Sequence, residues 1–159
     1  MDWLGTLFLF LHIGGAIVAF GPTIAFPFLA ARAAKEPVHG NFVLRSMEWL
    51  TAKVVEPGAV FVFLMGVGLI VTRGLNPLSE GWLALAIVLF IVTLSFSYFV
   101  QLPILRKMVA LTSPTPASAD GPPGPPPGFR ELSVRAGRGG QFMSVMLIGM
   151  LFLMVAKPF

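Results

Sequence analysis

The sequence predicts an all-α integral membrane protein, a four-helix bundle whose first helix is kinked. Two observations predict this class. Of the 159 residues, 56% are hydrophobic and only 11% are charged, whereas a soluble domain carries about 25% charged residues. The apolar residues also form long blocks with few charges, which is typical of helices surrounded by lipid. A water-soluble enzyme is therefore excluded.

The first apolar block, residues 3–31, contains no charged residue. A helix of this length would extend about 43 Å, against a hydrocarbon core of about 30 Å. Pro22 and Pro27 each remove a backbone donor and clash with the preceding helical turn. We therefore expect a span over about residues 3–25 that ends or bends near residues 20–25.

Three further apolar blocks follow, and glycine, proline or basic residues lie at the end of each. Such residues commonly stop a helix at the membrane interface. The last block is the shortest, near the lower limit for a helix that crosses the bilayer. We expect these spans over about residues 50–72, 81–105 and 141–156.

The basic residues are distributed unevenly between the two sides of the predicted bundle. The connections at residues 32–53 and 106–138 contain four and five Lys or Arg residues, whereas the remaining connection and the two tails contain two together. Cytoplasmic loops are enriched in Lys and Arg. We therefore expect the large loops in the cytoplasm and both termini outside (N-out/C-out), in a multi-pass protein of the cell membrane, with a bacterial inner membrane as the expected location.

The second large loop contains a segment rich in proline. Residues 112–128 hold seven of the fourteen prolines of the chain. A segment of this composition cannot bury enough apolar surface to fold, so we expect a flexible, extended cytoplasmic linker. A binding site for a partner that recognises PxxP motifs is the alternative.

Composition and motifs exclude several kinds of chemistry. The chain has no cysteine, which excludes disulfides, thiolate metal sites and a cysteine nucleophile. The basic residues lie between apolar blocks and form no continuous stripe, so no nucleic-acid partner is expected. The sequence lacks phosphate-binding, metalloprotease and Ser/His/Asp patterns. No catalytic residue is therefore assigned, and whether the protein is an enzyme stays open.

His12 is the one histidine within a predicted span, about 13 Å from Trp3 along the helix and near the membrane midplane. As an axial ligand it would hold haem b, with Gly15 and Ala16 making room for the porphyrin face. Alternatively, it bonds to a carbonyl or hydroxyl group of a neighbouring helix, and the small residues serve helix packing. The absence of a second intramembrane histidine for bis-histidine ligation favours the packing interpretation, and a metal is expected at His12 only if haem is bound.

Glu56 lies about one turn inside the cytoplasmic boundary of the second predicted span. A carboxylate at this depth is either paired with a nearby cation or is a buried group that handles protons. Lys53 and Arg45 are close enough in the sequence to pair with it, which favours the ion-pair interpretation. Glu48 and Arg45 are expected in the same interfacial cluster.

Four short motifs of the chain are typical of known membrane protein families: Leu9 to Ala16, Met47-Glu48-Trp49, Glu56-Pro57 with Gly66, and Ala156 to Phe159. With them the chain resembles the HemJ-type protoporphyrinogen oxidases, the copper-resistance protein D-like membrane domains, and a related uncharacterised bacterial family of small four-helix integral membrane proteins. The last is similar over most of the chain outside the proline-rich linker. The resemblance to HemJ implies a membrane haem protein acting on porphyrins, with its helix-one histidine matched by His12.

Two functional hypotheses follow from these features. In the first, the chain is a HemJ- or CopD-like membrane protein that binds haem through His12 for a redox role, with Glu56 handling protons. In the second, it is a non-catalytic accessory or scaffold subunit, with the lipid bilayer and other membrane chains or further copies of itself as partners. Transport is a weaker third option, indicated by the prolines that break the first helix.

Overall fold

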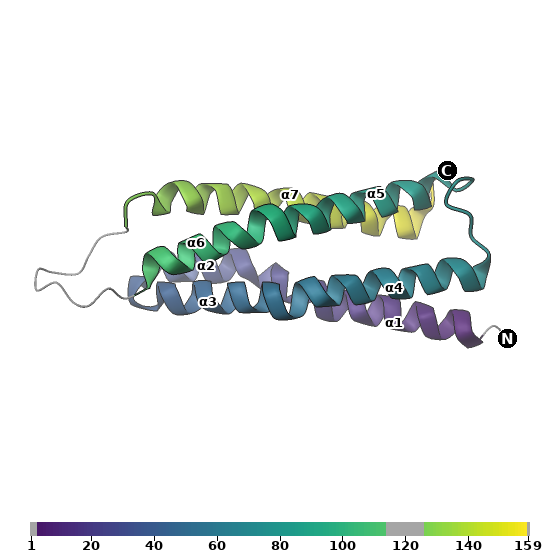
Figure 1. Cartoon of the computed structure of the whole chain (residues 1–159), viewed down its shortest axis with the longest axis horizontal. Helices are drawn as coiled ribbons and strands as arrows, with labels where there is room; N and C mark the ends of the chain where they lie inside the picture. The colour runs from purple at the N-terminus through teal and green to yellow at the C-terminus, as the bar shows by residue number, and fades with distance from the viewer. Residues whose placement is uncertain (1–2, 114–125, 159) are drawn as a thin grey trace, which may run out of the picture.

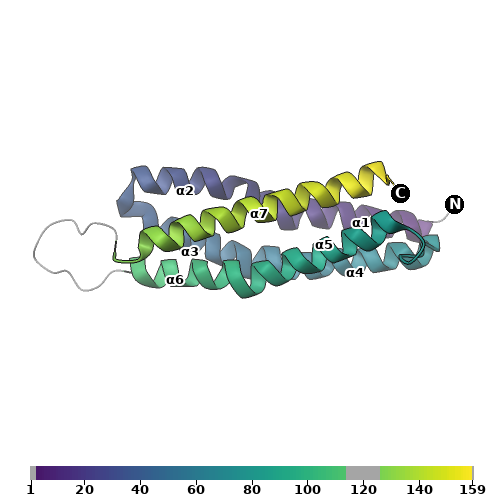
Figure 2. The same ribbon diagram turned by 90° about the horizontal axis from the view of Figure 1, so that it is seen from above.

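The structure, a computed structural model, describes residues 3–113 and 126–158. These residues form four long helical segments and contain no β-strand, which confirms the predicted all-α class. The segments run side by side, and the first begins at the end of the bundle where the fourth finishes (Figures 1 and 2). Of the predicted linker over residues 112–128, residues 114–125 lie outside the described part. Each segment is long and apolar enough to cross a membrane: Trp3–Lys35, Gly40–Arg73, Gly81–Thr112 and Phe129–Ala156.

The first segment is broken where the prolines predict a bend. Helix α1 (Trp3–Phe20) leads into a 3₁₀ segment, η1 (Gly21–Ala25), and helix α2 (Phe26–Lys35) continues from it. Pro22 and Pro27 lie at the start of η1 and α2, the positions where a missing N–H costs least. The kink in the first helix is therefore confirmed.

The second and third segments each contain a π-helical stretch that the sequence analysis did not predict. The backbone N–H of Glu56 bonds to the carbonyl of Thr51, and that of Leu102 to the carbonyl of Ser97, five residues back in each case. A proline follows each stretch, and the wider turn accommodates its ring and missing N–H. The elements are α3 (Gly40–Leu50), η3 (Thr51–Val55) and α4 (Glu56–Arg73), then α5 (Gly81–Phe96), η4 (Ser97–Gln101) and α6 (Leu102–Thr112).

The helices are longer than the predicted spans. Helix α7 (Phe129–Ala156) is continuous and begins well before residue 141. Its first turns are basic and are stabilised by an ion pair between Arg135 and Glu131, at 2.7 Å, so the helix continues into the region of the charged residues. The second segment likewise begins at Gly40. At the other end, α4 stops at Gly74, whose left-handed backbone (φ 62°) ends the helix as predicted.

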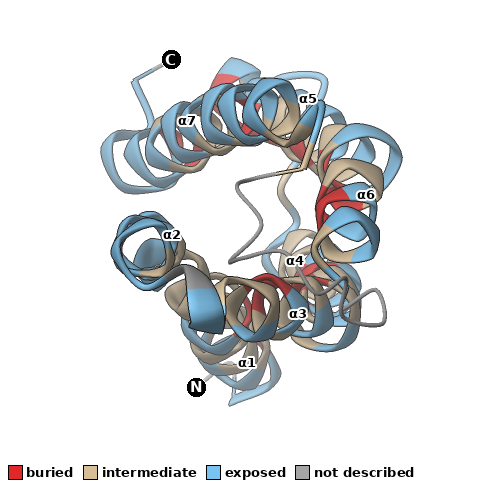
Figure 3. Cartoon of the chain, turned by 90° about the vertical axis from the view of Figure 1, so that its left-hand side faces the viewer, coloured by how far each residue is buried: buried red, intermediate tan, exposed pale blue. Residues whose placement is uncertain are grey.

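The four segments pack as neighbours in chain order. Helix α1 packs along α4, α2 along α3, α3 along α6, and both α5 and α6 along α7. The first and fourth segments do not pack together in this way, because neither α1 nor α2 packs along α7 as a helix pair. Seen end-on, the ribbons form a ring that is interrupted between α2 and α7 (Figure 3).

The two ends of the bundle differ in chemistry. The charged end, defined as residues 32–53, 106–113 and 129–138, holds most of the ionisable side chains. There the side-chain amide of Asn41 donates to the carbonyl of Val109 at 3.1 Å and to the hydroxyl of Thr112 at 2.9 Å, so it joins α3 to the end of α6. The opposite end is held by a small apolar cluster of Trp82, Leu83, Ala86 and Leu153.

Candidate functional site

His12 lies in the contact between α1 and α4. Its Nδ1 atom is 2.9 Å from the backbone carbonyl of Val62. Because a carbonyl only accepts, Nδ1 carries the proton and Nε2 has the lone pair. The ring also lies against Gly66, where an added Cβ would be 3.1 Å from the ring atom Cε1. The bond to a carbonyl of a neighbouring helix is the one that the packing interpretation predicts, and it leaves Nε2 without a partner among the described residues, as an axial ligand would also require.

The small residues around His12 serve the same helix contact. A Cβ atom at Gly15 would lie 2.9 Å from the ring of Phe61 and 3.2 Å from Val62, so α4 already occupies the space beside this glycine. A Cβ at Gly58 would lie 2.6 Å from the Cβ of Ala19. Small residues of this kind allow two helix backbones to approach closely.

Haem at His12 would need space on the face of α1 that carries Gly15 and Ala16. The face that would receive a porphyrin is covered by α4 at Gly15, and Ala16 is only partly buried beside it. Haem binding through His12 stays a prediction, and the packing of the glycines argues against it.

Glu56 begins α4 and bonds across the bundle to the third segment. The hydroxyl of Ser97 donates to Oε1 of Glu56 at 2.5 Å, and Oε2 has no hydrogen-bonding partner among the described residues. Neither Lys53 nor Arg45 forms an ion pair with Glu56, and both are exposed. The preferred ion-pair interpretation is therefore not what the structure contains. The π-helical turn of η3 separates Lys53 from Glu56, and its extra residue turns the lysine away from the carboxylate.

The interfacial cluster around Glu48 exists, but with a different partner. Glu48 pairs with Arg106 of α6 at 3.2 Å rather than with Arg45 of its own helix. The partner comes from the third segment because α3 and α6 pack together at the charged end. Sequence reasoning considered only near neighbours in the chain, and this pair is distant in sequence.

Glu56 is among the residues that line a cavity of about 20 Å³ between the helical segments, which is room for about one water molecule. The hydroxyl of Thr93 also lines it but donates to the carbonyl of Leu89 in its own helix, at 2.7 Å. The hydroxyl of Ser97, in contrast, bonds across the segments to Glu56. At one side, Phe90 of the lining stacks on Phe63, with 5.5 Å between ring centroids. The apolar lining consists of Phe20, Val55, Ala59, Phe90, Leu94, Met143, Leu147 and Met150.

The cavity lies where three of the four segments depart from regular α-helix. Phe20 precedes η1, Val55 ends η3 and Ser97 begins η4, and all three line the cavity. Broken or bulged helices in membrane proteins are often found at binding sites near the bilayer midplane. The breaks at η1, η3 and η4 thus lie at about the same depth in the bundle as the carboxylate of Glu56.

Gln101 is a second polar residue of the third segment, and it lies close to the depth of the cavity. The amide nitrogen of Gln101 donates to the carbonyl of Ala136 at 3.1 Å, and its oxygen is buried without a partner. The oxygen lies so close to Gly139 that a side chain there would collide with it. A side chain at position 139 would therefore displace the amide group of Gln101.

Sequence reasoning assigned no role to Ser97, although a signal was present. Thr51 and Ser97 each precede a proline by six positions, at Pro57 and Pro103. The repeated pattern marks the two π-helical stretches. It could have indicated that Glu56 and Ser97 belong to matching breaks in neighbouring helices.

The family model described as "Predicted integral membrane protein (DUF2269)" matches residues 6–158. No curated protein and no solved structure matches the chain. The match confirms the resemblance to an uncharacterised family of integral membrane proteins. It gives no support to a relationship with HemJ or copper-resistance protein D, and its description says nothing of haem.

Proposed function

Because the chain belongs to this family of predicted integral membrane proteins (DUF2269), we propose that it works within the lipid bilayer and binds a cation, at minimum a proton, at Glu56. The observation that carries the proposal is the Glu56–Ser97 pair at the edge of an otherwise apolar cavity. Binding of this kind is the central step of proton or cation movement through a membrane protein, which is the activity that we propose.

The energetics of a charge in lipid support this proposal. On insertion scales an acidic side chain costs about 2.5–3.5 kcal/mol at the centre of a membrane helix, and Glu56, about one turn inside the charged end, bears part of this cost. One hydrogen bond to a charged group contributes about 1.5–3 kcal/mol, and Ser97 supplies only one such bond. A proton or cation on the unpartnered Oε2 would offset the remaining cost. Intramembrane carboxylates with these properties mark ion and proton pathways in other membrane proteins.

The binding step can be tested with dicyclohexylcarbodiimide, which modifies protonated carboxyl groups in apolar surroundings. We expect peptide mass spectrometry of the labelled protein, in mild detergent, to find the adduct on Glu56. The internal control is Glu48, which is paired with Arg106 and should stay unmodified. Monovalent cations are added as competitors to identify a site that takes more than a proton. Labelling of Glu48 and Glu56 to the same extent would contradict the proposal.

The transport step requires a flux measurement. In proteoliposomes with an entrapped pH-sensitive dye, we expect a proton flux that Glu56→Gln abolishes and Ser97→Ala reduces. The matched control is Glu131→Gln, which removes an exposed carboxylate at the charged end and should leave the flux unchanged. Equal fluxes in all three variants and in the native protein would overturn the proposed activity.

A second candidate function is that of an accessory or scaffold subunit. One observation favours it: the first and fourth segments do not pack as a pair, so the bundle lacks one helix contact that a closed four-helix ring would have. A further membrane chain or a second copy could complete that contact. Chemical cross-linking in native membranes, followed by mass spectrometry, should then recover links from α2 and α7 to another chain, whereas links confined to one copy would exclude this role.

A further inference from the structure

A second depression lies on the outside of the bundle, between the third and fourth segments at the charged end. Its volume is about 360 Å³, and it is open on its outer side. The third segment contributes Phe96, Val100 and Ile104, and α7 contributes Arg135, Arg138 and Phe142. We refer to these six residues as the outer groove. It is separate from the cavity at Glu56.

One wall of the outer groove is an apolar strip. Phe96, Val100 and Ile104 follow one another at intervals of four residues, so their side chains lie one above the next on a helix face. The strip is about 12 Å long. Phe142 extends it from α7, with its ring centroid 4.8 Å from that of Phe96. A strip of this length and chemistry matches a segment of an acyl chain.

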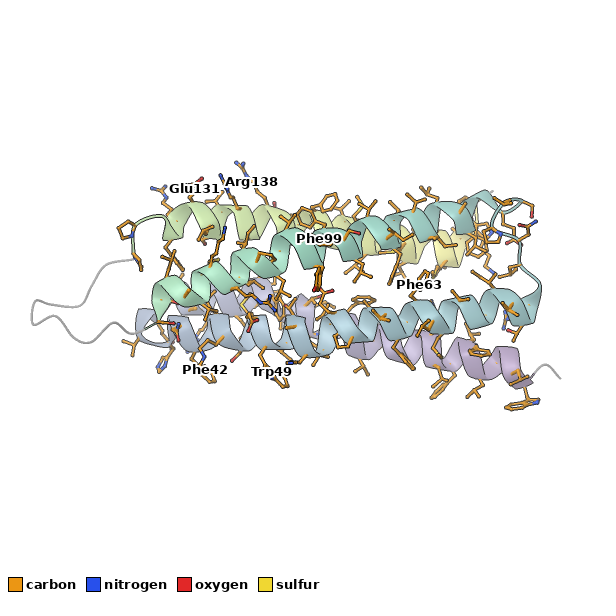
Figure 4. All side chains as sticks on the ribbon, viewed as in Figure 1. Phe42, Trp49, Phe63, Phe99, Glu131 and Arg138 are labelled. Atoms are coloured by element: carbon orange, nitrogen blue, oxygen red, sulfur yellow. The ribbon has the colours of Figure 1, made fainter. Side chains whose placement is uncertain are left out.

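The mouth of the outer groove is cationic. Arg135 is held by Glu131 at 2.7 Å, whereas Arg138 has no ion pair or hydrogen bond within the part of the chain that the structure describes. Figure 4 shows Glu131 and Arg138 on the side of α7 that points away from the other helices. The guanidinium of Arg138 is therefore available to an external anion.

The position of Arg138 along α7 defines its depth. The residues that follow it, 139–156, carry no charge and would extend about 27 Å, close to the thickness of the hydrocarbon core. Arg138 thus lies at the boundary where lipid phosphates are found. From this boundary the third segment leads inward through Ile104 and Val100 to Phe96, so the apolar strip continues into the membrane.

We propose that the outer groove binds an anionic phospholipid, with the lipid phosphate on Arg138 and one acyl chain along the strip from Ile104 to Phe96. Arg135 adds positive charge one turn away. The charge of the mouth favours a lipid with net negative charge over a zwitterionic one, since basic clusters beside spanning helices attract anionic headgroups. A neutral apolar helix would leave the free guanidinium without a partner. This inference does not depend on the proposed role of Glu56.

Native mass spectrometry of the delipidated protein in mild detergent tests the proposal, with phosphatidylglycerol and phosphatidylcholine added in turn. We expect preferential retention of phosphatidylglycerol and about a fivefold loss of its affinity in Arg138→Gln, as for one basic residue near a membrane surface. The matched control is Arg130→Gln, which removes an exposed arginine of the same helix outside the groove and should change the affinity little.

A second variant tests the apolar strip without altering charge. Val100→Trp should fill the groove and weaken phosphatidylglycerol binding while the thermal unfolding temperature is retained. Equal losses in Arg138→Gln and Arg130→Gln would show a general effect of surface charge and overturn the site. Competition by inorganic phosphate at the concentration of the lipid, or unchanged binding in Val100→Trp, would show an anion site without an acyl chain and also overturn it.

Discussion

His12 and Glu56 are both polar residues in spanning helices, yet the structure treats them differently. His12 lies in the contact between α1 and α4, where its Nδ1 donates to the carbonyl of Val62 and its ring packs against Gly66. Glu56 lines a small cavity and accepts one hydrogen bond across segments, from Ser97. A side chain bonded to a backbone carbonyl of the next helix contributes to packing, whereas a carboxyl group with a single donor can also take a proton or a cation. Depth in the membrane alone does not distinguish the two cases.

The largest effect on stability is expected from placing a side chain where α1 and α4 approach each other closely. Gly58→Leu places a side chain against Ala19, where an added Cβ would already be 2.6 Å from the Cβ of that residue. We expect a loss of at least about 3 kcal/mol in unfolding free energy, at the upper end of overpacking costs. Thermal or denaturant unfolding in detergent measures it. Gly14→Leu is the matched control, because nothing lies within 4 Å of a Cβ there; equal losses would show that the contact is not tight.

A smaller effect is expected at the cavity. Ser97→Ala removes the hydrogen-bond donor that Glu56 has among the described residues and should cost about 1–3 kcal/mol, as for a buried acceptor left without its donor. In the Glu56→Gln background the same substitution should cost less, so a double-mutant cycle isolates the pair. The control is Ser144→Ala, an exposed hydroxyl that bonds to Gly140 of its own helix. A cycle with no coupling would remove Ser97 from the site.

His12→Ala should have a more modest effect. Hydrogen bonds between membrane helices average about 0.6 kcal/mol, and His12 loses one such bond to Val62. If His12 serves packing, ultraviolet–visible spectra of the native protein and the variant, oxidised and then reduced, should be the same. A Soret band that is present in the native protein and lost in folded His12→Ala would instead establish haem ligation and reverse the comparison with Glu56.

The smallest effect on stability is expected from a test of orientation. The chain has no cysteine, so single cysteines can be introduced without removing native ones. Since the charged end is predicted to face the cytoplasm, a membrane-impermeant maleimide should label Asn76→Cys in intact cells and Lys107→Cys only after permeabilisation. The reverse pattern would place the termini inside. Either result identifies the side of the membrane to which Glu56 is closer.

The sequence was sufficient for the features that depend on composition and proline. Long apolar blocks predicted the four helical segments. Pro22 and Pro27 predicted the bend at η1, and Gly74 predicted the end of α4. The helix lengths were underestimated because apolar blocks show where lipid ends, not where a helix ends. The continuation of α7 back to Phe129 depends instead on residues that form helix equally well in water.

The candidate site was predicted only in part. Glu56 was identified as the acidic residue at depth, but its partner comes from another segment, and no local pattern specifies which helices are neighbours. The π-helical stretches also shift the register, so the short spacing between Lys53 and Glu56 was misleading. Such stretches are stabilised by contacts between segments and leave little trace in hydrophobic periodicity.

The length of the helices has a consequence for how the protein is stabilised. Segments of 28 to 34 residues are about 42–51 Å long, so roughly 12–21 Å of each extends beyond a hydrocarbon core of about 30 Å. In the aqueous part, burial of Leu44, Met47, Leu105 and Met108 is driven by the hydrophobic effect. In lipid the hydrophobic effect does not drive helices together, and the close approach of Gly15 and Gly58 to their neighbours stabilises the helix contact instead. We therefore expect urea to destabilise the charged end and a harsher detergent to destabilise the opposite end. The same continuous helices thus respond to two different changes in their surroundings.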